Sequence, residues 1–541
     1  MKKFVVLSLV SMLVLAFGGV VYAQEKAPVL EFKASGFIDV ISEYMVNVPQ
    51  AGNSTSAAGA TGPADTLFGP PVAYMMPAYD KAFNKKMAYM ETRGRLKFDA
   101  IMGKDLMGTF FFEIDSNRWG DRVEGITGSN AGTAPQRNRA GFWGVADRAS
   151  VEVKNMFLTF GVPWVPIPIT VQGGIIPMAI RPAAFLATDG PGINAAIKVD
   201  PAMIRLIWMK AVENKDWAAD DADLYAIEAS AKISTLTVGG YALYFNMNTY
   251  PASDGVTRIV VPTTLPATTA PTWPTGAVLG EPSYRSDVWW FGMYAAGKAG
   301  PVNLSADLIL NNGKIEDRRE ISPQARDVKL SGWGGILNVS FPWEKFNFGG
   351  ATIYGSGADQ HKTSASGLPG SAVASGTGTS RKAGVYIVPA GTEGGTGHSI
   401  ILCGSGINRG NTGYNQGAST AHAAASFGGL WINKLFGSFQ VTPSYKVTLE
   451  GMYIRDTTKN GNTIGDARKA PFGSTDKRDD KSIGWEFDLF NEIQLYKQLK
   501  FSFGGGILFA GDAMDFYDTA RSKNVSPKNP WVITTNLTYS F

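Results

Sequence analysis

The sequence has very little of the chemistry that most enzymes and metal sites use. Its 541 residues include one cysteine and three histidines, and the formal net charge is only +4. Cys403 has no second cysteine with which to form an intramolecular disulfide, and His361, His398 and His422 all lie in or beside one Gly/Ser-rich stretch. A catalytic nucleophile needs a base held rigidly beside it. We therefore expect neither an enzyme, nor a cofactor, nor a metal site.

Long apolar runs are missing beyond the N-terminus. Two lysines precede an apolar run over residues 4–21, and Val-Tyr-Ala at residues 21–23 fits a signal-peptidase site. We expect residues 1–23 to be a secretory signal peptide that is removed, and Gln24 after the cut, rather than a cysteine, argues against a lipoprotein. Past it, no run of roughly 18 apolar residues could form a transmembrane helix. Without the two lysines the net charge is about +2, which does not indicate nucleic acid as a partner.

The sequence instead contains a series of short segments with two different faces, of which the last is typical. In residues 531–541 one parity is aromatic and aliphatic apart from Thr535, and the other is polar apart from Val532. Side chains alternate between the faces of a strand, so this is a two-faced strand about 10 residues long. Tilted, it is long enough to cross a bilayer; the soluble alternative is the edge strand of a β-sandwich. The residues expected to close a barrel and to act as its assembly signal are Trp531, Leu537, Tyr539 and Phe541. We expect this strand to pair with the first strand near residues 32–40, which would leave no free edge.

Tight turns separate these segments and alternate with longer polar or Gly-rich stretches. The turns are near residues 103–105, 163–166, 200–201, 233–236, 300–301, 342–343, 442–443 and 497–498. Most contain Gly, Pro, Asp or Asn, which supply turn geometry. With a first strand near residues 30–46 and the terminal strand, they predict about 18 strands, or about 16 as the alternative, because the strands near 191–212 and 423–455 are poorly bounded.

This pattern predicts an all-β fold: a transmembrane, antiparallel, up-and-down β-barrel in the bacterial outer membrane, with short periplasmic turns and long external loops. Residues 24–541 would form this single domain. The 63 glycines and the 11% aromatic content match small residues on barrel walls and aromatic belts at both membrane faces. Residues 356–421 are expected to form a mobile external loop. The acidic run at residues 220–223 is either a solvated loop end or a site for a divalent cation.

The most informative charges lie on two segments joined by the turn at 103–105. On each segment, charged residues share one face and apolar residues share the other. A three-residue turn would place Arg95 opposite Glu113 and Arg93 opposite Asp115, and such cross-strand pairs stabilise a sheet modestly. This wall either biases ion passage or is a purely structural ion-pair network, and both can hold. The predicted pore-lining charges are Glu91, Arg93, Arg95, Lys97, Asp99, Glu113 and Asp115.

A candidate constriction is the third external stretch, residues 179–190. It is short and fairly apolar, and it carries Arg181 and Asp189. An apolar loop is poorly placed in external water, so we expect this loop to fold into the barrel. Arg181 and Asp189 are then the predicted constriction residues.

Several motifs together point to a family. They are residues 30–36, 93–100, 106–115, 118–120, 153–158 and 292–296, with the aromatic terminus. In these motifs the chain resembles the homotrimeric outer-membrane porins described from sulfate-reducing-type bacteria. The likeness covers most of the expected strands, but neither the Gly/Ser-rich loop nor residues 250–284. It implies a homotrimer in outer-membrane lipid, inserted by the outer-membrane assembly machinery, that passes small hydrophilic solutes.

Three functions remain open at this point. The first is a porin, a water-filled channel for passive diffusion of small hydrophilic solutes and ions. The second is a substrate-selective channel of the same fold, for sugars as an example. In it Trp289, Phe291 and Phe111 would line the lumen as a stacking track; the alternatives for these rings are the interfacial aromatic belt and a subunit contact. The third is an exported structural or adhesion protein that displays long loops.

Overall fold

The computed structural model describes much of the chain between residues 29 and 541. The described ranges are 29–47, 86–119, 151–182, 184–213, 220–248, 258–260, 278–282, 284–317, 327–359, 361–362, 382–389, 392, 399–402, 427–470, 476–518 and 521–541. The expected signal peptide at residues 1–23 lies outside them, as do Cys403, His398 and His422. Within these ranges the helical content is the three-residue 3₁₀ helix η3 (Asp512–Met514). No helix there has the length and apolar character to span a membrane.

One sheet of 19 strands organises the described chain. Its two-residue strand β16 (Lys382–Ala383) pairs in parallel with β14 (Val328–Trp343). The other 18 are antiparallel to their neighbours, which confirms the predicted up-and-down arrangement and strand count. They are β1 (Leu30–Val46), β2 (Lys86–Met102), β3 (Leu106–Arg118), β4 (Glu152–Gly161), β5 (Ile169–Ile180), β6 (Leu186–Val199), β7 (Ala202–Val212), β8 (Ala222–Ile233), β9 (Leu236–Met247), β12 (Tyr284–Ala299), β13 (Val302–Asp317), β14 (Val328–Trp343), β15 (Phe346–Gly355), β17 (Leu430–Thr442), β18 (Tyr445–Asp456), β19 (Ser482–Tyr496), β20 (Leu499–Ala510) and β23 (Trp531–Ser540). Two small hairpins, β10 (Arg258–Val260) with β11 (Val278–Pro282) and β21 (Phe516–Asp518) with β22 (Lys523–Val525), lie outside this sheet.

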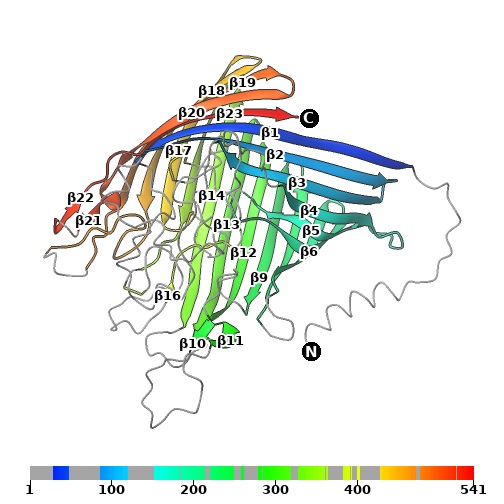
Figure 1. Ribbon diagram of the computed structural model, residues 1–541, viewed down its shortest axis with the longest axis horizontal. Helices are drawn as coiled ribbons and strands as arrows, with labels where there is room; N and C mark the ends of the chain where they lie inside the picture. The colour runs from blue at the N-terminus through cyan, green and yellow to red at the C-terminus, as the bar shows by residue number, and fades with distance from the viewer. Residues whose placement is uncertain are drawn as a thin grey trace, which may run out of the picture.

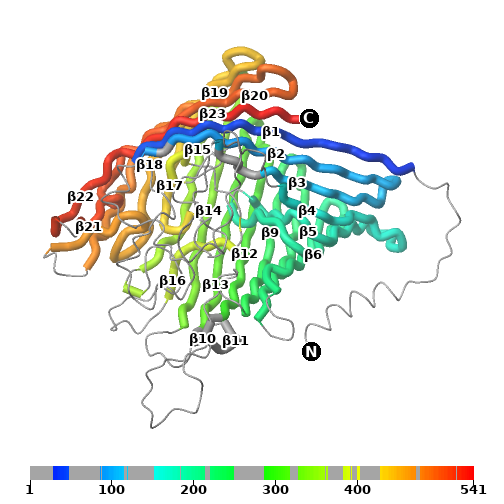
Figure 2. The backbone as a smooth tube through the Cα atoms, in the orientation of Figure 1, coloured from blue at the N-terminus to red at the C-terminus, as the bar shows by residue number. Residues whose placement is uncertain are grey.

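The barrel closes where its first and last strands meet. β1 pairs with β23 over residues 37–46 and 531–540. Next to this register, the Gly36 N–H donates to the Phe541 carbonyl at 2.9 Å, and the Phe541 N–H donates to the Gly36 carbonyl at 3.0 Å. Blue β1 lies alongside red β23 in both views (Figure 1, Figure 2). The predicted pairing of these two strands is confirmed, shifted along β1 from the expected residues 32–40. Closure removes the sheet edge that would otherwise recruit other chains.

The eight predicted tight turns are all present between consecutive strands, although the turn after β14 falls at residues 344–345 rather than 342–343. The prediction for residues 179–190 was wrong in one respect. Most of them belong to β5 and β6, which pair from Ile180 opposite Leu186, so only residues 181–185 connect the two strands. The turn-forming residues at the start of β6 obscured the strand, because ladder pairing overrides local preference.

The outer face of the barrel is apolar and the inner face is mixed. On β13, Leu308 and Leu310 are exposed, whereas Asp307, Ile309 and Asn311 are buried. A soluble β-sandwich would bury the leucines and expose the aspartate. The inverted order is that of a barrel whose outer wall faces lipid.

Aromatic side chains form two rows on this outer face. Near the long connections, Trp289 stacks on Tyr244 with ring centroids 4.5 Å apart. This row continues with Trp333 and its neighbours and is here called the outer aromatic row, because it lies at the end of the barrel that carries the long connections. Near the short turns, other rings stack in the same way, including Trp343 with Phe346 and Phe346 with Phe439. Membrane barrels carry such rows at both interfaces.

Of the three aromatic residues considered for a track in the lumen, two lie on the outer face instead, as the alternative of an interfacial belt or subunit contact requires. Trp289 and Phe291 are 44% and 47% exposed on the outer face. They belong to the parity of β12 that lies opposite the exposed leucines of β13. Phe111 alone lies on the inner face, with the Arg95 guanidinium 5.9 Å from its ring centre.

The buried apolar core lies inside the barrel. Trp290, Phe185, Tyr386 and Phe427 are among its largest fully buried side chains. Trp290 belongs to wall strand β12, whereas Phe185 and Tyr386 come from connections that enter the barrel. We expected residues 356–421 to be a mobile external loop, and this was wrong for the parts that the structure describes. Residues 385–389 and 399–402 are buried, because a few apolar residues within the Gly/Ser-rich stretch pack on the inner wall.

Candidate functional site: the interior of the barrel

The predicted charge pair on β2 and β3 is present, with Arg95 opposite Glu113. Arg95 Nη2 lies 2.8 Å from Glu113 Oε1, and Arg93 Nε donates to the same oxygen at 2.6 Å. Lys154 Nζ, from β4, lies 3.2 Å from the other oxygen. Glu113 is only 5% exposed, so one buried carboxylate holds three cations in place.

The remaining predicted charges extend this network along the same wall. Lys154 also pairs with Asp189 at 2.5 Å, and Asp189 accepts a hydrogen bond from the Asn155 amide at 2.8 Å. Lys97 pairs with Asp99 at 2.8 Å. Glu91 is 4% exposed on the same face of β2.

Arg93 does not lie opposite Asp115 as expected. The register of β2 and β3 shifts by one residue between Thr92 and Gly94, which is what a β-bulge produces. Arg93 therefore turns to Glu113 instead. The side chain of Asp115 falls outside the described part of the chain.

Arg181 reaches across the interior of the barrel. Its Nε lies 2.5 Å from Asp307 Oδ1, and its Nη2 lies 2.7 Å from Asp307 Oδ2 and 3.0 Å from Ser305 Oγ. Strands β6, β7, β8, β9 and β12 separate β5 from β13 along the wall. The contact therefore joins the β5–β6 connection, inside the barrel, to a strand six places further round the 18-strand wall. The hydrogen bond to Asp307 raises the pKa of Arg181 above its ordinary value, although burial opposes this, so the guanidinium stays charged.

The rest of the connection between β5 and β6 packs into the apolar core. The Phe185 ring stacks on Tyr241 with centroids 4.9 Å apart and lies 6.1 Å from the Trp290 ring. The Tyr386 hydroxyl donates to the Ala184 carbonyl at 3.0 Å. The third external connection thus folds inward, as expected, and meets a second inward segment there.

That second segment, residues 384–389, is here called the strap. Trp290 Nε1 donates to the Ile387 carbonyl at 2.8 Å, and the Ile387 N–H donates to Asn311 Oδ1 at 3.2 Å. Glycines of β14 make room for it. A Cβ at Gly332 would lie 2.1 Å from the Val385 carbonyl oxygen, which is far inside van der Waals contact. The wall and the strap therefore fit each other closely.

A third inward segment, residues 399–402, is here called the latch. Ser399 Oγ lies 3.0 and 2.8 Å from the two carboxylate oxygens of Glu486, and the Ile401 N–H donates to the same group at 3.2 Å. Glu486 is fully buried on the inner face of β19. A buried carboxylate is costly unless donors satisfy it, and the latch provides them.

The acidic run at residues 220–223 is neither a solvated loop end nor an open cation site. Asp220, Asp221 and Asp223 are buried, and Lys210 Nζ lies 3.0 Å from Asp221 and 3.6 Å from Asp223. A lysine of β7 therefore occupies the place that a cation would take. In the described ranges, no group of three or more His, Cys, Asp or Glu residues is arranged to hold a metal ion.

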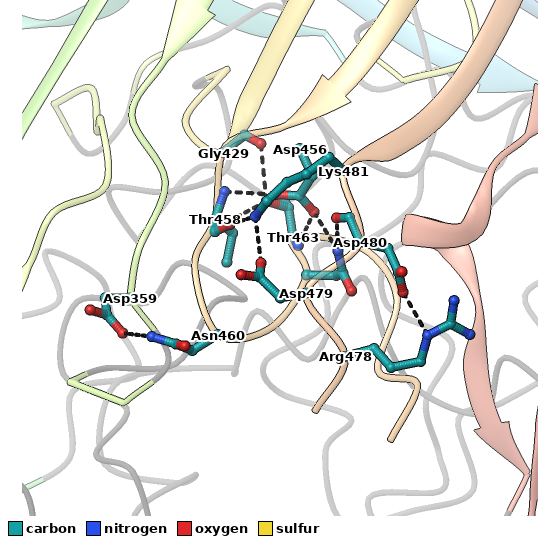
Figure 3. A network of polar contacts seen from close by, with 11 residues as sticks. Asp359, Gly429, Asp456, Thr458, Asn460, Thr463, Arg478, Asp479, Asp480 and Lys481 are labelled. Atoms are coloured by element: carbon teal, nitrogen blue, oxygen red, sulfur yellow. Dashed lines mark hydrogen bonds and ion pairs between the residues drawn. The ribbon is translucent and has the colours of Figure 1, made fainter. Parts of the chain in front are cut away.

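A polar network orders the connection between β18 and β19 (Figure 3). Asp456 accepts hydrogen bonds from the N–H groups of Thr458 at 2.8 Å and Thr463 at 2.6 Å, and from Thr463 Oγ1 at 2.9 Å. Asn460 Nδ2 donates to Asp359 Oδ1 at 2.8 Å, which ties this connection to the chain after β15. Burial of Asp359 opposes its ionisation, but the Asn460 and backbone hydrogen bonds hold its pKa below the usual value.

Replacing Asp456 with alanine is expected to loosen this connection without unfolding the barrel. The N–H groups of Thr458 and Thr463 lose their acceptor, and each unsatisfied buried donor costs about 1–3 kcal/mol. Hydrogen–deuterium exchange over residues 457–481 should therefore be faster than in the wild type. Asp359→Ala removes only the second link and should have a smaller effect. Unchanged exchange in the Asp456 variant would contradict this role.

Sequence reasoning found the charged wall and Arg181 but missed Asp307, Asn311 and Glu486 as partners of inward segments. The sequence places each of them on the polar face of its strand. That pattern indicates a wet inner wall, but it contains no signal for which distant segment will dock there.

No family model matches the chain, and no curated protein matches it in sequence. Among solved structures, a BenF-like porin from Pseudomonas fluorescens is 9% identical with a TM-score of 0.44, and the match covers 94% of this chain and 98% of that one. OccK8 (OprE) of Pseudomonas aeruginosa is 8% identical with a TM-score of 0.43 and the same coverage. OpdK of that species, solved with vanillate, is 10% identical with a TM-score of 0.43 and the same coverage.

These likenesses are too distant to transfer a substrate, and they do not confirm the homotrimeric porin family that the sequence motifs indicated. What is established rests on the chain's own strand pairings. It is a closed, 18-strand antiparallel barrel with an apolar outer face and a charged, partly filled interior.

Proposed function

We propose that this chain is a bacterial outer-membrane channel through which small hydrophilic solutes and ions diffuse. The observation that carries the proposal is the inverted barrel: leucines and aromatic rings are exposed outside, and ion pairs such as Arg95–Glu113 lie inside. A closed barrel satisfies its backbone hydrogen bonds without an edge, as a lipid environment demands. Buried charges on the inner wall are stable only if they are paired or reached by water.

Within this fold, the interior favours a selective channel over a wide diffusion pore. The Arg181–Asp307 contact holds the β5–β6 connection inside the lumen, and the strap and the latch are seated on its wall. Channels select by width and by the charges at their narrowest part. We therefore place Arg181 at the constriction, and Asp189 with Lys154 on the charged wall beside it.

The trimer and the assembly signal remain predictions. Trp531, Leu537, Tyr539 and Phe541 share the outer side of the closing strand, and Phe541 is 48% exposed beside Gly36. This position leaves the terminal ring accessible to the assembly machinery.

Solute flux into liposomes tests the proposed function. Purified protein reconstituted into liposomes should admit small sugars and amino acids and exclude larger oligosaccharides. A heat-modifiable band on an unheated detergent gel would show that the barrel is folded in the same preparation. A folded barrel that admits none of these solutes would support the structural or adhesion alternative instead.

Replacing Glu113 with glutamine should shift ion selectivity toward anions. The substitution removes one negative charge beside Arg93, Arg95 and Lys154 while keeping a side chain of the same size. The reversal potential under a salt gradient reports this shift. Glu344→Gln, at an exposed turn outside the lumen, is the matched control. Equal reversal potentials in the wild type and the Glu113 variant would show that the cluster is purely structural.

A further inference from the structure

Three lysines stand side by side on the barrel near the long connections. Lys314 on β13 lies opposite Lys329 on β14. Lys329 is in turn the register partner of Lys382 on β16. Residues directly opposite one another on neighbouring strands share a face and lie close together. The three ammonium groups therefore form one row across three adjacent strands, here called the lysine row.

The lysine row faces outward. Lys329 is exposed, whereas its neighbours Val328 and Leu330 are 2% and 1% exposed. Lys382 is likewise exposed beside buried Ala383. Lys314 has the parity of the exposed leucines of β13 and keeps about half of its side chain exposed. None of the three points into the solute pathway.

The row also lies at a defined level, just beyond the outer aromatic row. Asn312 is opposite Trp289, and Lys314 follows two residues further along β13. Two residues of strand span about 7 Å. Because aromatic rows mark the headgroup level of a membrane, the lysine row reaches the zone of the lipid headgroups. Exposed Leu310 and Phe291 lie directly below it, where acyl chains would pack.

The charges of this patch are not balanced within the described chain. Lys314 pairs with Glu316, which also pairs with Arg285. Lys329 and Lys382 have no carboxylate partner among the described residues. Like charges that face each other across strands are destabilising, so an anion placed against the row would relieve the repulsion among the described residues.

The acidic residue nearest the row on β12 is already engaged. Asp287 lies opposite Lys314. Its Oδ1 accepts hydrogen bonds from the Tyr244 hydroxyl at 2.6 Å and from the Asn246 amide at 2.8 Å. Asp287 lessens the positive potential at one end of the row, and exposed Asp327, two residues before Lys329, lessens it near the middle. Among the described residues, no carboxylate forms an ion pair with Lys329 or Lys382.

We propose that the lysine row binds the phosphate of an anionic lipid headgroup in the outer leaflet. The inference rests on the membrane location in the proposed function, but not on solute passage. Lysine binds phosphate as a compact charge, and basic clusters at a membrane surface attract anionic headgroups. A lipid is favoured over a free anion because the row opens toward the lipid-facing wall, with apolar surface beneath it for the chains.

The test compares lipid retention by two triple variants. Full-length protein is placed in phosphatidylcholine nanodiscs that contain a minor fraction of phosphatidic acid, and lipid that stays bound is counted by native mass spectrometry. Lys314→Gln/Lys329→Gln/Lys382→Gln should reduce retained phosphatidic acid by about tenfold relative to the wild type. The control removes three exposed lysines near the short turns, Lys198, Lys232 and Lys298, and should retain lipid as the wild type does.

Each result decides the proposal. Equal retention by both triple variants, or by the lysine-row variant and the wild type, would overturn it. Displacement of the lipid by inorganic phosphate at low concentration would show a site for soluble phosphate and overturn the lipid assignment. If the triple variant does not fold, Lys329→Gln alone must lower retention. Conductance should be unchanged in these variants, so a failure here is separate from a failure of the channel function.

Discussion

Replacing Arg181 with alanine is expected to raise single-channel conductance and to destabilise the barrel. Arg181 links the β5–β6 connection inside the barrel to β13, so its loss is expected to release that connection and to widen the lumen. It also leaves Asp307, 8% exposed, without its charged partner. Breaking a buried ion pair by removing one side costs about 3–5 kcal/mol. Conductance in planar bilayers and thermal unfolding in detergent measure the two effects separately.

The double variant Arg181→Ala/Asp307→Ala separates the two effects. With both charges gone, much of the stability should return, because no buried charge is left unpaired. The lumen contact stays absent, so conductance should remain high. Arg205→Ala is the matched control. Arg205 pairs with Glu228 on the adjacent strand at 2.6 Å, so this ion pair links neighbouring strands and holds no inward connection. Wild-type conductance in the Arg181 variant would show that Arg181 does not narrow the pathway.

Replacing Gly332 with alanine is expected to unseat the strap. The added Cβ would lie 2.1 Å from the Val385 carbonyl oxygen. The clashing atoms of the strap are backbone atoms, so the clash cannot be relieved by a change of side-chain rotamer. The strap then loses its hydrogen bonds with Trp290 and Asn311. Conductance should rise, and amide exchange at residues 384–389 should become faster than in the wild type.

Gly173→Ala provides the control for the strap. A Cβ at Gly173 would meet no atom within 4 Å, so this variant should conduct as the wild type does. It reports the general cost of a glycine substitution in a barrel strand. If Gly332→Ala leaves both conductance and amide exchange of the strap unchanged, the strap does not pack tightly against Gly332. Its proposed role in narrowing the pathway would then be contradicted.

The barrel could be predicted from the sequence because its signals are local. Apolar and polar residues alternate in residues 531–541 and in β13, which predicts an outer and an inner face. Most of the eight tight turns contain Gly, Pro or Asp. Arg95 opposite Glu113 follows from turn length alone. The same reasoning failed for Arg93, because a one-residue register shift leaves no mark in the residue types around it.

The filled interior could not be predicted because its contacts are long-range. Tyr386 and Ala184 are 202 residues apart in the chain, and Ser399 and Glu486 are 87 apart. The strap lies in a Gly/Ser-rich stretch whose composition is typical of a mobile loop. Contacts such as the fit between Gly332 and Val385 and the hydrogen bond from Trp290 to Ile387 show that part of this stretch docks on the wall, and they depend on three-dimensional proximity.

Water and small solutes are expected to cross the membrane through the barrel. Single-channel recording of the purified protein in a planar bilayer tests this passage most directly. Discrete conductance steps from a preparation that runs as a folded, heat-modifiable barrel are the predicted result, with larger steps in the Arg181 and Gly332 variants. A folded, inserted barrel that gives no steps, in the wild type and in both variants, would contradict the channel function.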